Sequence, residues 1–458
     1  MSNDNQPTVD AVRATLAALG GEPLSRIQKA DNSRAAPQRD SLERGALHLV
    51  REAGILRWHI GFPRKPGPGI DQLNHRQAQR KGLRRAPVVA PIVLDQTLFS
   101  KLEPSKIGEW LKVADQRLSR PAWDSKGQLW GLRRLAPDGK LVPFAAAELP
   151  ALAGKKVLMF IHGTFSHCDS VMSGIGSAPN GPAMISAAFG AYDRVLFFDH
   201  PTLGMSPMLN AFDLASRLAG GLPASLDIVA HSRGGLVARW FCEGFRHPDL
   251  KCRAILVGSP LAGTSLASPA RVRAVMDFLA NVGDAASGAL GGVLLGFAST
   301  LASLFARVAG TLATPLADAI VALVPGLAAQ SREGGNVELR SLRTNTGAFD
   351  FGAPASPIRY HAIQSNFAPV EKGVWGFLKS FIARPGASFL DTAADFIFED
   401  ENDLVVDVAS MTETGELNGN RLAIAEIAHD FGTSRTVHHC NYFEQRATVA
   451  AIRKTFGF

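Results

Sequence analysis

The sequence predicts an α/β protein built on a doubly wound, mostly parallel β-sheet. Short apolar runs recur between residues 157 and 363 and are separated by segments of helix length. Such runs are typical of strands buried on both faces, and their alternation with helices favours parallel strands joined by crossovers. A turn rich in serine and glycine joins the third run directly to a helix. The runs are Val157–Ile161, Val195–Phe198, Asp227–Ala230, Ala254–Val257 and Ile358–Ile363.

The composition is that of a globular protein. Of the 458 residues, 46% are hydrophobic and 19% are charged, which excludes a disordered chain. The net charge of +7 is uneven, because residues 1–150 hold 24 basic and 15 acidic residues, whereas the remainder holds 24 and 26. A basic region can bind an anionic surface or a protein partner, or simply be solvated. No nucleic-acid-binding motif accompanies the charge, so specific nucleic-acid binding is not expected.

Three segments are expected along the chain. Residues 1–86 are polar and rich in arginine and turn-forming residues, and they predict a basic, partly disordered N-terminal arm. Residues 87–150 contain short apolar runs and predict a small, β-rich lead-in segment. Residues 151–458 carry the alternating pattern and predict the α/β domain itself.

An apolar insertion at about residues 266–330 interrupts the alternation. Within it, Ala285–Ala306 carries no charge and is long enough to span a bilayer. The content of Gly, Ser and Thr in this stretch lowers its hydrophobicity, however. Charges such as Asp284, Arg307 and Asp318 occur on either side of it within the insertion. We therefore expect a helical cap, placed at the carboxyl ends of the strands where ligands bind in open α/β sheets, and no integral membrane span.

Cysteine usage and the N-terminus point to a reducing compartment. The four cysteines form no CxxC pair, so neither a disulfide scaffold nor a structural zinc site is expected. No HExxH or comparable ligand set occurs, so the sequence predicts no metal and no cofactor. The first twenty residues contain no long apolar core, which argues against a cleaved signal peptide. A cytoplasmic location is the simplest expectation, with leaderless secretion as the alternative.

The serine-containing turn is the strongest chemical signal. Ala230-His231-Ser232-Arg233-Gly234-Gly235 follows an apolar strand and precedes the helical sequence Leu236–Trp240. A strand, a tight turn with serine at its tip and a helix form a nucleophile elbow. The turn strains the serine backbone and requires small residues two positions before and after it, which Ala230 and Gly234 provide. Ser232 is therefore the predicted nucleophile.

A second motif predicts an oxyanion hole. Phe160-Ile161-His162-Gly163-Thr164-Phe165 begins within a strand and ends in the loop that follows it. Acyl transfer needs two backbone N–H donors directed at the developing oxyanion. One comes from the residue after the nucleophile, here Arg233, and the other from a strand-end loop. We assign the second donor to Thr164, with its neighbour Phe165 as the alternative.

The acid and base of a triad are expected beyond residue 232, because the order in this arrangement is serine, acid, histidine. An acidic loop contains Asp403 just before an apolar run, and Asp400 is its alternative. His438 and His439 lie near the C-terminus, and spacing does not separate them. His231 is interpreted as structural.

These motifs together resemble the lipase-like α/β-hydrolases, in particular the branch of lecithin:cholesterol acyltransferase and the bacterial triacylglycerol lipases. The resemblance implies that the acid precedes a short apolar pair, which favours Asp403, and that Asn-Tyr-Phe follows the catalytic histidine, which favours His439. It also implies a helical lid at the position of residues 266–330. The matching segments are Phe160–Phe165, Asp227–Arg239, Val257–Thr264, Asn402–Val406 and His439–Asn441.

The sequence therefore predicts a serine esterase or lipase acting on a small-molecule or lipid ester with an apolar acyl group. Ser232, His439 and Asp403 would form the triad, with the N–H groups of Thr164 and Arg233 as the oxyanion hole. An acyltransferase on the same fold is one alternative. A non-enzymatic binding module that uses the hydrolase scaffold is the other.

Overall fold

A computed structural model of the chain divides it into two compact units by its internal contacts. One unit comprises Met1–Trp110 and Val272–Ile320, and the other comprises Leu111–Arg271 and Val321–Phe458. We call these the N-terminal and C-terminal units. The structure describes residues 6–23, 44–52, 55–61, 92–100, 106–119, 130–264, 289–308, 324–332, 335–345, 358–367, 402–403, 405–417, 420–421 and 424–458, with single residues and pairs between 267 and 284.

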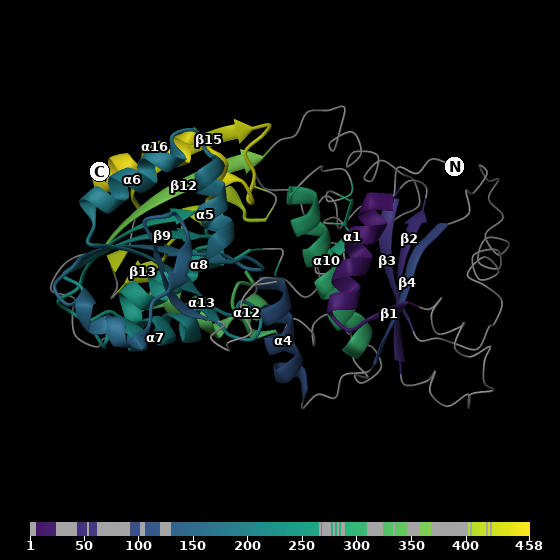
Figure 1. Cartoon of the computed structure of the whole chain (residues 1–458). Helices are drawn as coiled ribbons and strands as arrows, with labels where there is room; N and C mark the ends of the chain where they lie inside the picture. The colour runs from purple at the N-terminus through teal and green to yellow at the C-terminus, as the bar shows by residue number, and fades with distance from the viewer. Residues whose placement is uncertain are drawn as a thin grey trace. The chain divides into compact units, whose positions relative to one another are not determined.

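The C-terminal unit is organised around an eight-stranded sheet (Figure 1). Its order is β15-β12-β10-β9-β7-β8-β5-β6. The six strands from β15 to β8 are parallel, whereas β5 pairs antiparallel with β8 and β6 with β5. The strands are β5 (Gly131–Leu135), β6 (Leu141–Pro143), β7 (Lys156–Ile161), β8 (Arg194–Asp199), β9 (Ser225–His231), β10 (Lys251–Val257), β12 (Arg359–Phe367) and β15 (Ile424–Ser434).

Helices cover both faces of this sheet, which confirms the predicted doubly wound α/β fold. Successive side chains of β7 enter opposite cores: Met159 and Ile161 pack with α7 and α8, whereas Leu158 and Phe160 pack with α5, α6 and α16. Period-two alternation of apolar side chains therefore fills two layers at once. The helices are α5 (Cys168–Ser177), α6 (Gly181–Ala191), α7 (Pro207–Leu218), α8 (Arg233–Trp240) and α16 (Arg446–Phe456).

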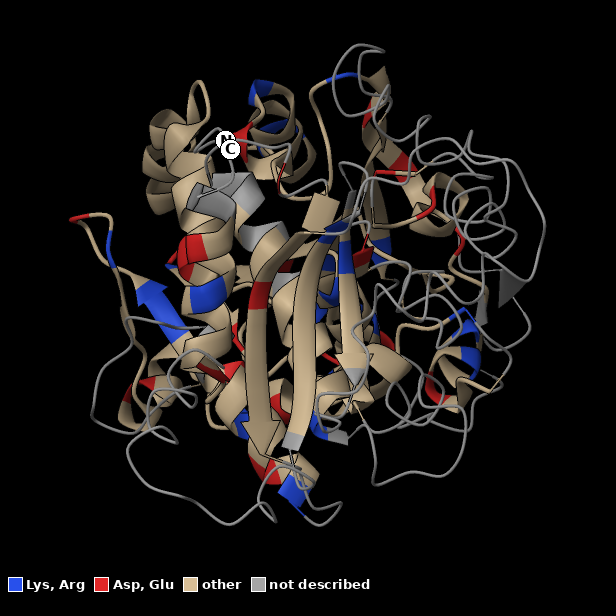
Figure 2. Ribbon diagram, turned by 90° about the vertical axis from the view of Figure 1, so that its right-hand side faces the viewer, with Lys and Arg blue, Asp and Glu red and all other residues tan. Residues whose placement is uncertain are grey.

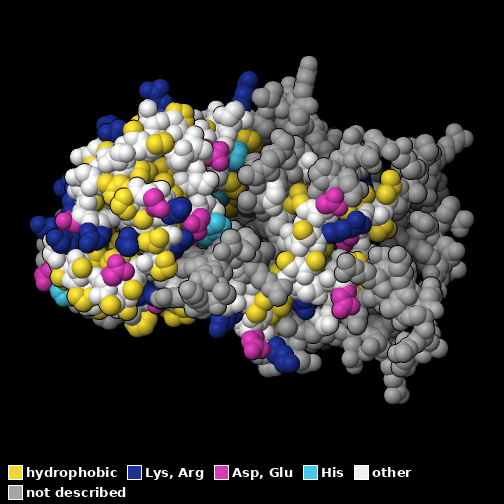
Figure 3. Space-filling model, viewed as in Figure 1, with side chains coloured by type: hydrophobic (Ala, Val, Ile, Leu, Met, Phe, Trp, Pro, Cys, Tyr) yellow, Lys and Arg dark blue, Asp and Glu magenta, His cyan; other side chains and the backbone are white. Residues whose placement is uncertain are grey.

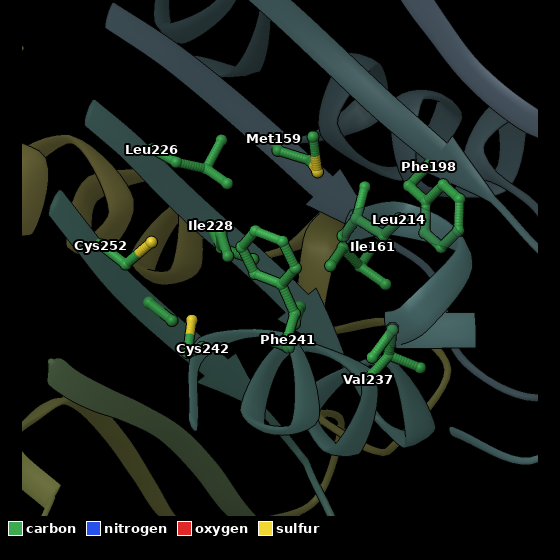
Figure 4. Packing of buried hydrophobic residues seen from close by; sticks show 14 of the residues in the cluster. Met159, Ile161, Phe198, Leu214, Leu226, Ile228, Val237, Phe241, Cys242 and Cys252 are labelled. Carbon is green, nitrogen blue, oxygen red and sulfur yellow. The ribbon is translucent and has the colours of Figure 1, made fainter. Parts of the chain in front are cut away.

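The core beneath α8 shows how tightly this layer is filled (Figure 4). Met159, Ile161 and Ile228 of the central strands face Val237 and Phe241 at the helix, and all five are almost completely buried. Burying a side chain of this size stabilises the fold by about 1.5–3 kcal/mol. Such packing holds the turn between β9 and α8 in one conformation.

Shorter elements complete the C-terminal unit. Two helices follow the insertion, α12 (Pro325–Ala328) and α13 (Val337–Arg343). A small sheet contains β11 (Thr344–Asn345), β13 (Glu416–Leu417) and β14 (Asn420–Arg421). Helix α4 (Ile107–Ser119) contains the point at which the two units divide. On the face of the C-terminal unit visible in Figure 3, hydrophobic, basic and acidic side chains are interspersed.

The N-terminal unit contains an antiparallel sheet of order β1-β4-β2-β3. Figure 2 looks onto this sheet, and charged residues are sparse along its strands. Strand β4, from the expected lead-in segment, pairs with β2, from the expected arm, so the sheet joins residues from both sides of the expected boundary at residue 86. Long-range strand pairing of this kind leaves no local signal in the sequence. The elements are α1 (Gln6–Ala18), β1 (Glu22–Pro23), β2 (Arg44–Glu52), β3 (Ile55–Gly61) and β4 (Ile92–Ser100).

The apolar insertion contributes α10 (Ala289–Val308) to this same unit. Helix α10 packs against α1 and the strands of the N-terminal sheet. Just before it, the side chain of Asn281 bonds to both the N–H and the C=O of Leu56 on β3, each at 2.7 Å. The described apolar side chains of α10 are thus buried within the N-terminal unit, and the expected cap at the carboxyl ends of the strands stays a prediction. None of the helices that the structure describes is long and apolar enough to cross a membrane.

Candidate active site

Ser232 lies at the tip of the turn between β9 and α8. Its backbone angles are φ 54° and ψ −129°, in the left-handed region that non-glycine residues rarely adopt. Neighbouring backbone leaves no room for larger residues: a Cβ on Gly234 would lie 2.6 Å from the carbonyl oxygen of Ile161, and one on Gly163 would lie 2.7 Å from Ser232 Cβ. This is the geometry of a nucleophile elbow.

Three of the predicted residues form one line of hydrogen bonds. Ser232 Oγ lies 2.8 Å from His439 Nε2, and His439 Nδ1 lies 2.8 Å from Asp403 Oδ2. All three side chains are buried. Because a carboxylate accepts from Nδ1, the imidazole proton resides there, and Nε2 is free to accept the serine proton.

Asp403 is fixed as a hydrogen-bond acceptor on both oxygens. Its Oδ1 accepts the N–H groups of Val405 and Val406 at 3.1 and 2.9 Å, and its Oδ2 accepts Tyr442 Oη at 3.0 Å in addition to His439. The backbone N–H of His439 also donates to the Asp403 carbonyl at 2.9 Å. Hydrogen bonds of this number fix the orientation of the carboxylate, which in turn holds the imidazole of His439 toward Ser232.

The neighbouring histidine points elsewhere. His438 stacks edge-on against Phe367 at 5.6 Å, and its Nδ1 accepts the N–H of Cys440 at 3.3 Å. Burial, together with the adjacent His439, lowers the pKa of His438 to about 4. The structure thus brings His439, and not His438, to Ser232. Asp400, the alternative acid, lies outside the described residues.

The backbone N–H groups of Thr164 and Arg233 are the expected oxyanion donors. Within the described part of the chain, neither the N–H of Thr164 nor that of Arg233 donates to another residue. Phe165, the alternative donor, instead donates its N–H to Thr202 Oγ1 at 3.3 Å. The buried Asp115 accepts three backbone N–H groups and the hydroxyl of the 202–204 loop, which fixes Thr202 in place. The geometry therefore favours Thr164 over Phe165.

A protein-family model matches most of the C-terminal unit and identifies the family of this chain. A model described as a domain of unknown function, DUF7379, matches residues 134–457. The chain belongs to this family. No curated protein matches the sequence.

Solved structures similar to this DUF7379 protein include a lipase, a lactone-degrading enzyme and a carboxylesterase. The mature lipase BlEst2 of Bacillus licheniformis is 15% identical, with a TM-score of 0.34, over 64% of this chain and 87% of that chain. Est816, titled as an N-acyl homoserine lactone degrading enzyme, is 14% identical, with a TM-score of 0.32, over 67% and 94%. The carboxylesterase CesB of Bacillus subtilis is 14% identical, with a TM-score of 0.28, over 77% and 98%.

Two residues of the DUF7379 domain support the site through contacts that the sequence does not predict. Tyr442 belongs to the Asn-Tyr-Phe segment, and its ring closes the space beside Gly258. At that glycine, with φ 53°, a Cβ would lie 2.7 Å from the Tyr442 ring and 3.0 Å from Asp403 Oδ2. His231 donates from Nε2 to the carbonyl of His439 at 2.8 Å, and burial lowers its pKa to about 3. No periodicity or motif signals contacts between such distant segments.

One buried group of the DUF7379 domain has the residue types of a metal site. Ligand atoms of His162, Cys168 and Asp199 lie within 4.8 Å of one another. Both ring nitrogens of His162 already have backbone partners, however, and Asp199 accepts the N–H of Cys168 and pairs with Arg133. A metal ion would have to displace these bonds, so the group fits a structural network better than a metal centre.

Proposed function

We propose that this protein is a serine hydrolase of carboxylic esters that acts through a Ser232–His439–Asp403 triad and an acyl-enzyme. One observation carries the proposal: Ser232, strained at the tip of an elbow, lies 2.8 Å from an imidazole whose other nitrogen is 2.8 Å from a buried carboxylate. A nucleophile, a base and an orienting acid in hydrogen-bond contact are what acyl transfer requires.

In the proposed reaction, Ser232 Oγ attacks the ester carbonyl while His439 Nε2 takes the hydroxyl proton. The N–H groups of Thr164 and Arg233 stabilise the oxyanion of the tetrahedral intermediate. The alcohol leaves with the proton from His439, and the acyl group remains on Ser232. Water then attacks the acyl-enzyme, giving its proton to His439, and the carboxylic acid departs as Ser232 is reprotonated.

Loss of one oxyanion donor costs about 10²–10³ in rate in other serine hydrolases. The first turn of α8 would also stabilise the oxyanion. Arg233 occupies this turn, where free N–H groups and the helix dipole favour negative charge. The backbone around Ser232 is therefore suited to a transition state that gains negative charge on oxygen.

An apolar acyl group, and kinship with the lecithin:cholesterol acyltransferase and triacylglycerol lipase branch, are parts of this proposal that rest on the sequence motifs. An acyltransferase would use the same residues with an alcohol in place of water. A cytoplasmic location, the boundaries of the N-terminal arm, and an anionic or protein partner for that arm stay predictions from the sequence.

Fluorophosphonate labelling of the full-length chain tests the proposal. We expect wild-type protein to label, Ser232→Ala to lose labelling, and Ser259→Ala, which removes another buried serine at the end of β10, to retain it. Hydrolysis of p-nitrophenyl esters of graded chain length then reports the acyl preference. A folded wild-type protein that neither labels nor cleaves any of these esters would favour the binding-module alternative.

A further inference from the structure

Two buried histidines lie stacked next to the oxyanion loop. His162 directly follows β7 and His200 directly follows β8, and their rings are parallel within 9° with centroids 4.1 Å apart. Both side chains are essentially inaccessible to solvent. Neither belongs to the proposed triad, yet His162 directly precedes Gly163 and Thr164.

Arg233 reaches the same pair with its side chain. Its Nη1 lies 3.2 Å from His200 Nδ1, and its Nη2 donates to the carbonyl of Met205 at 2.5 Å. No carboxylate of the described residues lies within ion-pair distance of this guanidinium, although Asp115 and Glu338 act on it from farther away. Burial lowers the pKa of Arg233 to about 10, so the group keeps its charge at neutral pH.

The hydrogen-bond partners fix where the protons lie. A guanidinium only donates, so His200 Nδ1 is an acceptor and the His200 proton is on Nε2, 3.2 Å from the His162 carbonyl. The backbone N–H of His200 donates to His162 Nε2 at 3.1 Å. The His162 proton is therefore on Nδ1, from which it donates to the carbonyl of Gly163 at 2.8 Å.

The bond donated by His162 Nδ1 ends on a peptide group that the proposed mechanism uses. The Gly163 carbonyl and the Thr164 N–H belong to the same trans peptide, so they point in opposite directions. A donor on the carbonyl side therefore fixes the direction of the Thr164 N–H, which the proposed mechanism uses for the oxyanion. It also polarises the peptide, since hydrogen bonds in series strengthen one another.

We propose that Arg233, His200 and His162 form a positioning relay that orients and polarises the Gly163–Thr164 peptide as an oxyanion donor. The inference rests on the proposed function and deepens it. Arg233 then acts twice: its backbone N–H is one oxyanion donor, and its side chain holds His200 in place. His200 in turn holds His162 by two bonds, from its ring to the His162 carbonyl and from its backbone N–H to His162 Nε2. His162 and His200 are positioning residues, because neither touches the reacting atoms.

Nitrogen NMR of the histidine rings tests the relay without any activity. In ¹⁵N-histidine-labelled full-length protein at neutral pH, we expect His162 as the Nδ1–H tautomer and His200 as the Nε2–H tautomer. His162→Asn and His200→Asn spectra would assign the signals. An Nε2–H tautomer for His162 would overturn the relay, because the proton would then face Asp199 instead of Gly163.

Two matched substitutions at His162 test the effect on catalysis. An asparagine amide lies near the place of Nδ1 and keeps a donor for Gly163, whereas a glutamine amide lies near the place of Nε2 and keeps only the partner for His200. We expect His162→Gln to lower kcat about 10- to 100-fold with little change in KM, a loss below that of a whole oxyanion donor. His162→Asn should lose less than a third as much. Equal losses would overturn the relay.

A transition-state analogue separates this role from general destabilisation. Trifluoromethyl ketones form a tetrahedral oxyanion on the serine, so their affinity should fall in His162→Gln and in Arg233→Met by the same factor as kcat/KM. Arg239→Met is the matched control: it removes a second buried arginine of α8, one paired with Glu243, and should leave kcat/KM within about threefold. A parallel loss in this control would contradict the relay.

The outcomes also distinguish the relay from the proposed function. Wild-type protein that does not label with a fluorophosphonate refutes the hydrolase proposal, whatever the tautomers. Labelling and turnover that survive unchanged in His162→Gln refute the relay while the hydrolase proposal stands.

Discussion

Removal of the Tyr442 hydroxyl tests how its hydrogen bond affects the charge on Asp403. The hydroxyl donates to Asp403 Oδ2 at 3.0 Å, the same oxygen that accepts from His439. Burial, followed by the adjacent Asp403, raises the pKa of Tyr442 well above its usual value, so the phenol is a neutral donor at every working pH. Tyr442→Phe removes this one donor and keeps the ring that fills the space beside Gly258.

The expected loss of stability follows from the type of hydrogen bond that is removed. A hydrogen bond to a charged group contributes about 1.5–3 kcal/mol, and we expect the free energy of unfolding to fall by this amount. Without the phenol, the negative charge on Oδ2 is less compensated and stabilises the protonated imidazole more strongly. We therefore expect the acid limb of kcat/KM to move to higher pH, by at most about two units, since one unit is about 1.4 kcal/mol.

The assay is the pH dependence of p-nitrophenyl butyrate hydrolysis, combined with urea unfolding. Tyr360→Phe is the control, because its hydroxyl donates to another buried carboxylate, Glu243, at 2.8 Å. We expect a comparable loss of stability in Tyr360→Phe but an unchanged pH profile. An unchanged acid limb in Tyr442→Phe, or a shift to lower pH, would refute the reasoning about charge compensation at Asp403.

Three further predictions concern the base, the second histidine of the site and the N-terminal unit. His439→Ala should reduce ester hydrolysis by at least three orders of magnitude, and His438→Ala by less than tenfold; equal losses in steady-state rates would show that the wrong imidazole was assigned. Because burial holds the pKa of His231 at about 3 in the folded protein, against about 6.5 when unfolded, the unfolded state binds more protons between these values. Stability should therefore fall as pH drops below about 6.5, by up to about 1.4 kcal/mol per pH unit for this group. His231→Gln keeps a donor for His439 and should make urea unfolding less dependent on pH; an unchanged slope between pH 4 and 6 would contradict this. Asn281→Ala removes both bonds to Leu56 and should destabilise the N-terminal unit by about 2–3 kcal/mol, seen as earlier hydrogen exchange of β2 and β3 with ester hydrolysis retained; unchanged exchange would show that these bonds contribute little.

The sequence determined the fold of the C-terminal unit because its signals are local. Apolar runs such as Val157–Ile161 can be buried only in a sheet covered on both faces. The residues two positions before and after Ser232 are small because the turn itself excludes larger ones there, so six consecutive residues are enough to predict the elbow. The resemblance to lipase-like hydrolases then narrowed the acid and base to Asp403 and His439.

Tertiary structure decided what depends on contacts between distant segments. His438 and His439 are chemically identical neighbours, and only the path of the loop places one imidazole 2.8 Å from Ser232. The pairing of β2 with β4 joins segments about 50 residues apart, and the packing of α10 on β2 joins segments more than 200 residues apart, so no local pattern exists for either contact. The direction of the protons in His162 and His200 likewise follows from partners on three different strand ends. Local steric limits and the periodicity of apolar residues determine the helices, strands and turns. The burial of a side chain, its orientation and the position of its protons depend on the residues that the fold brings around it.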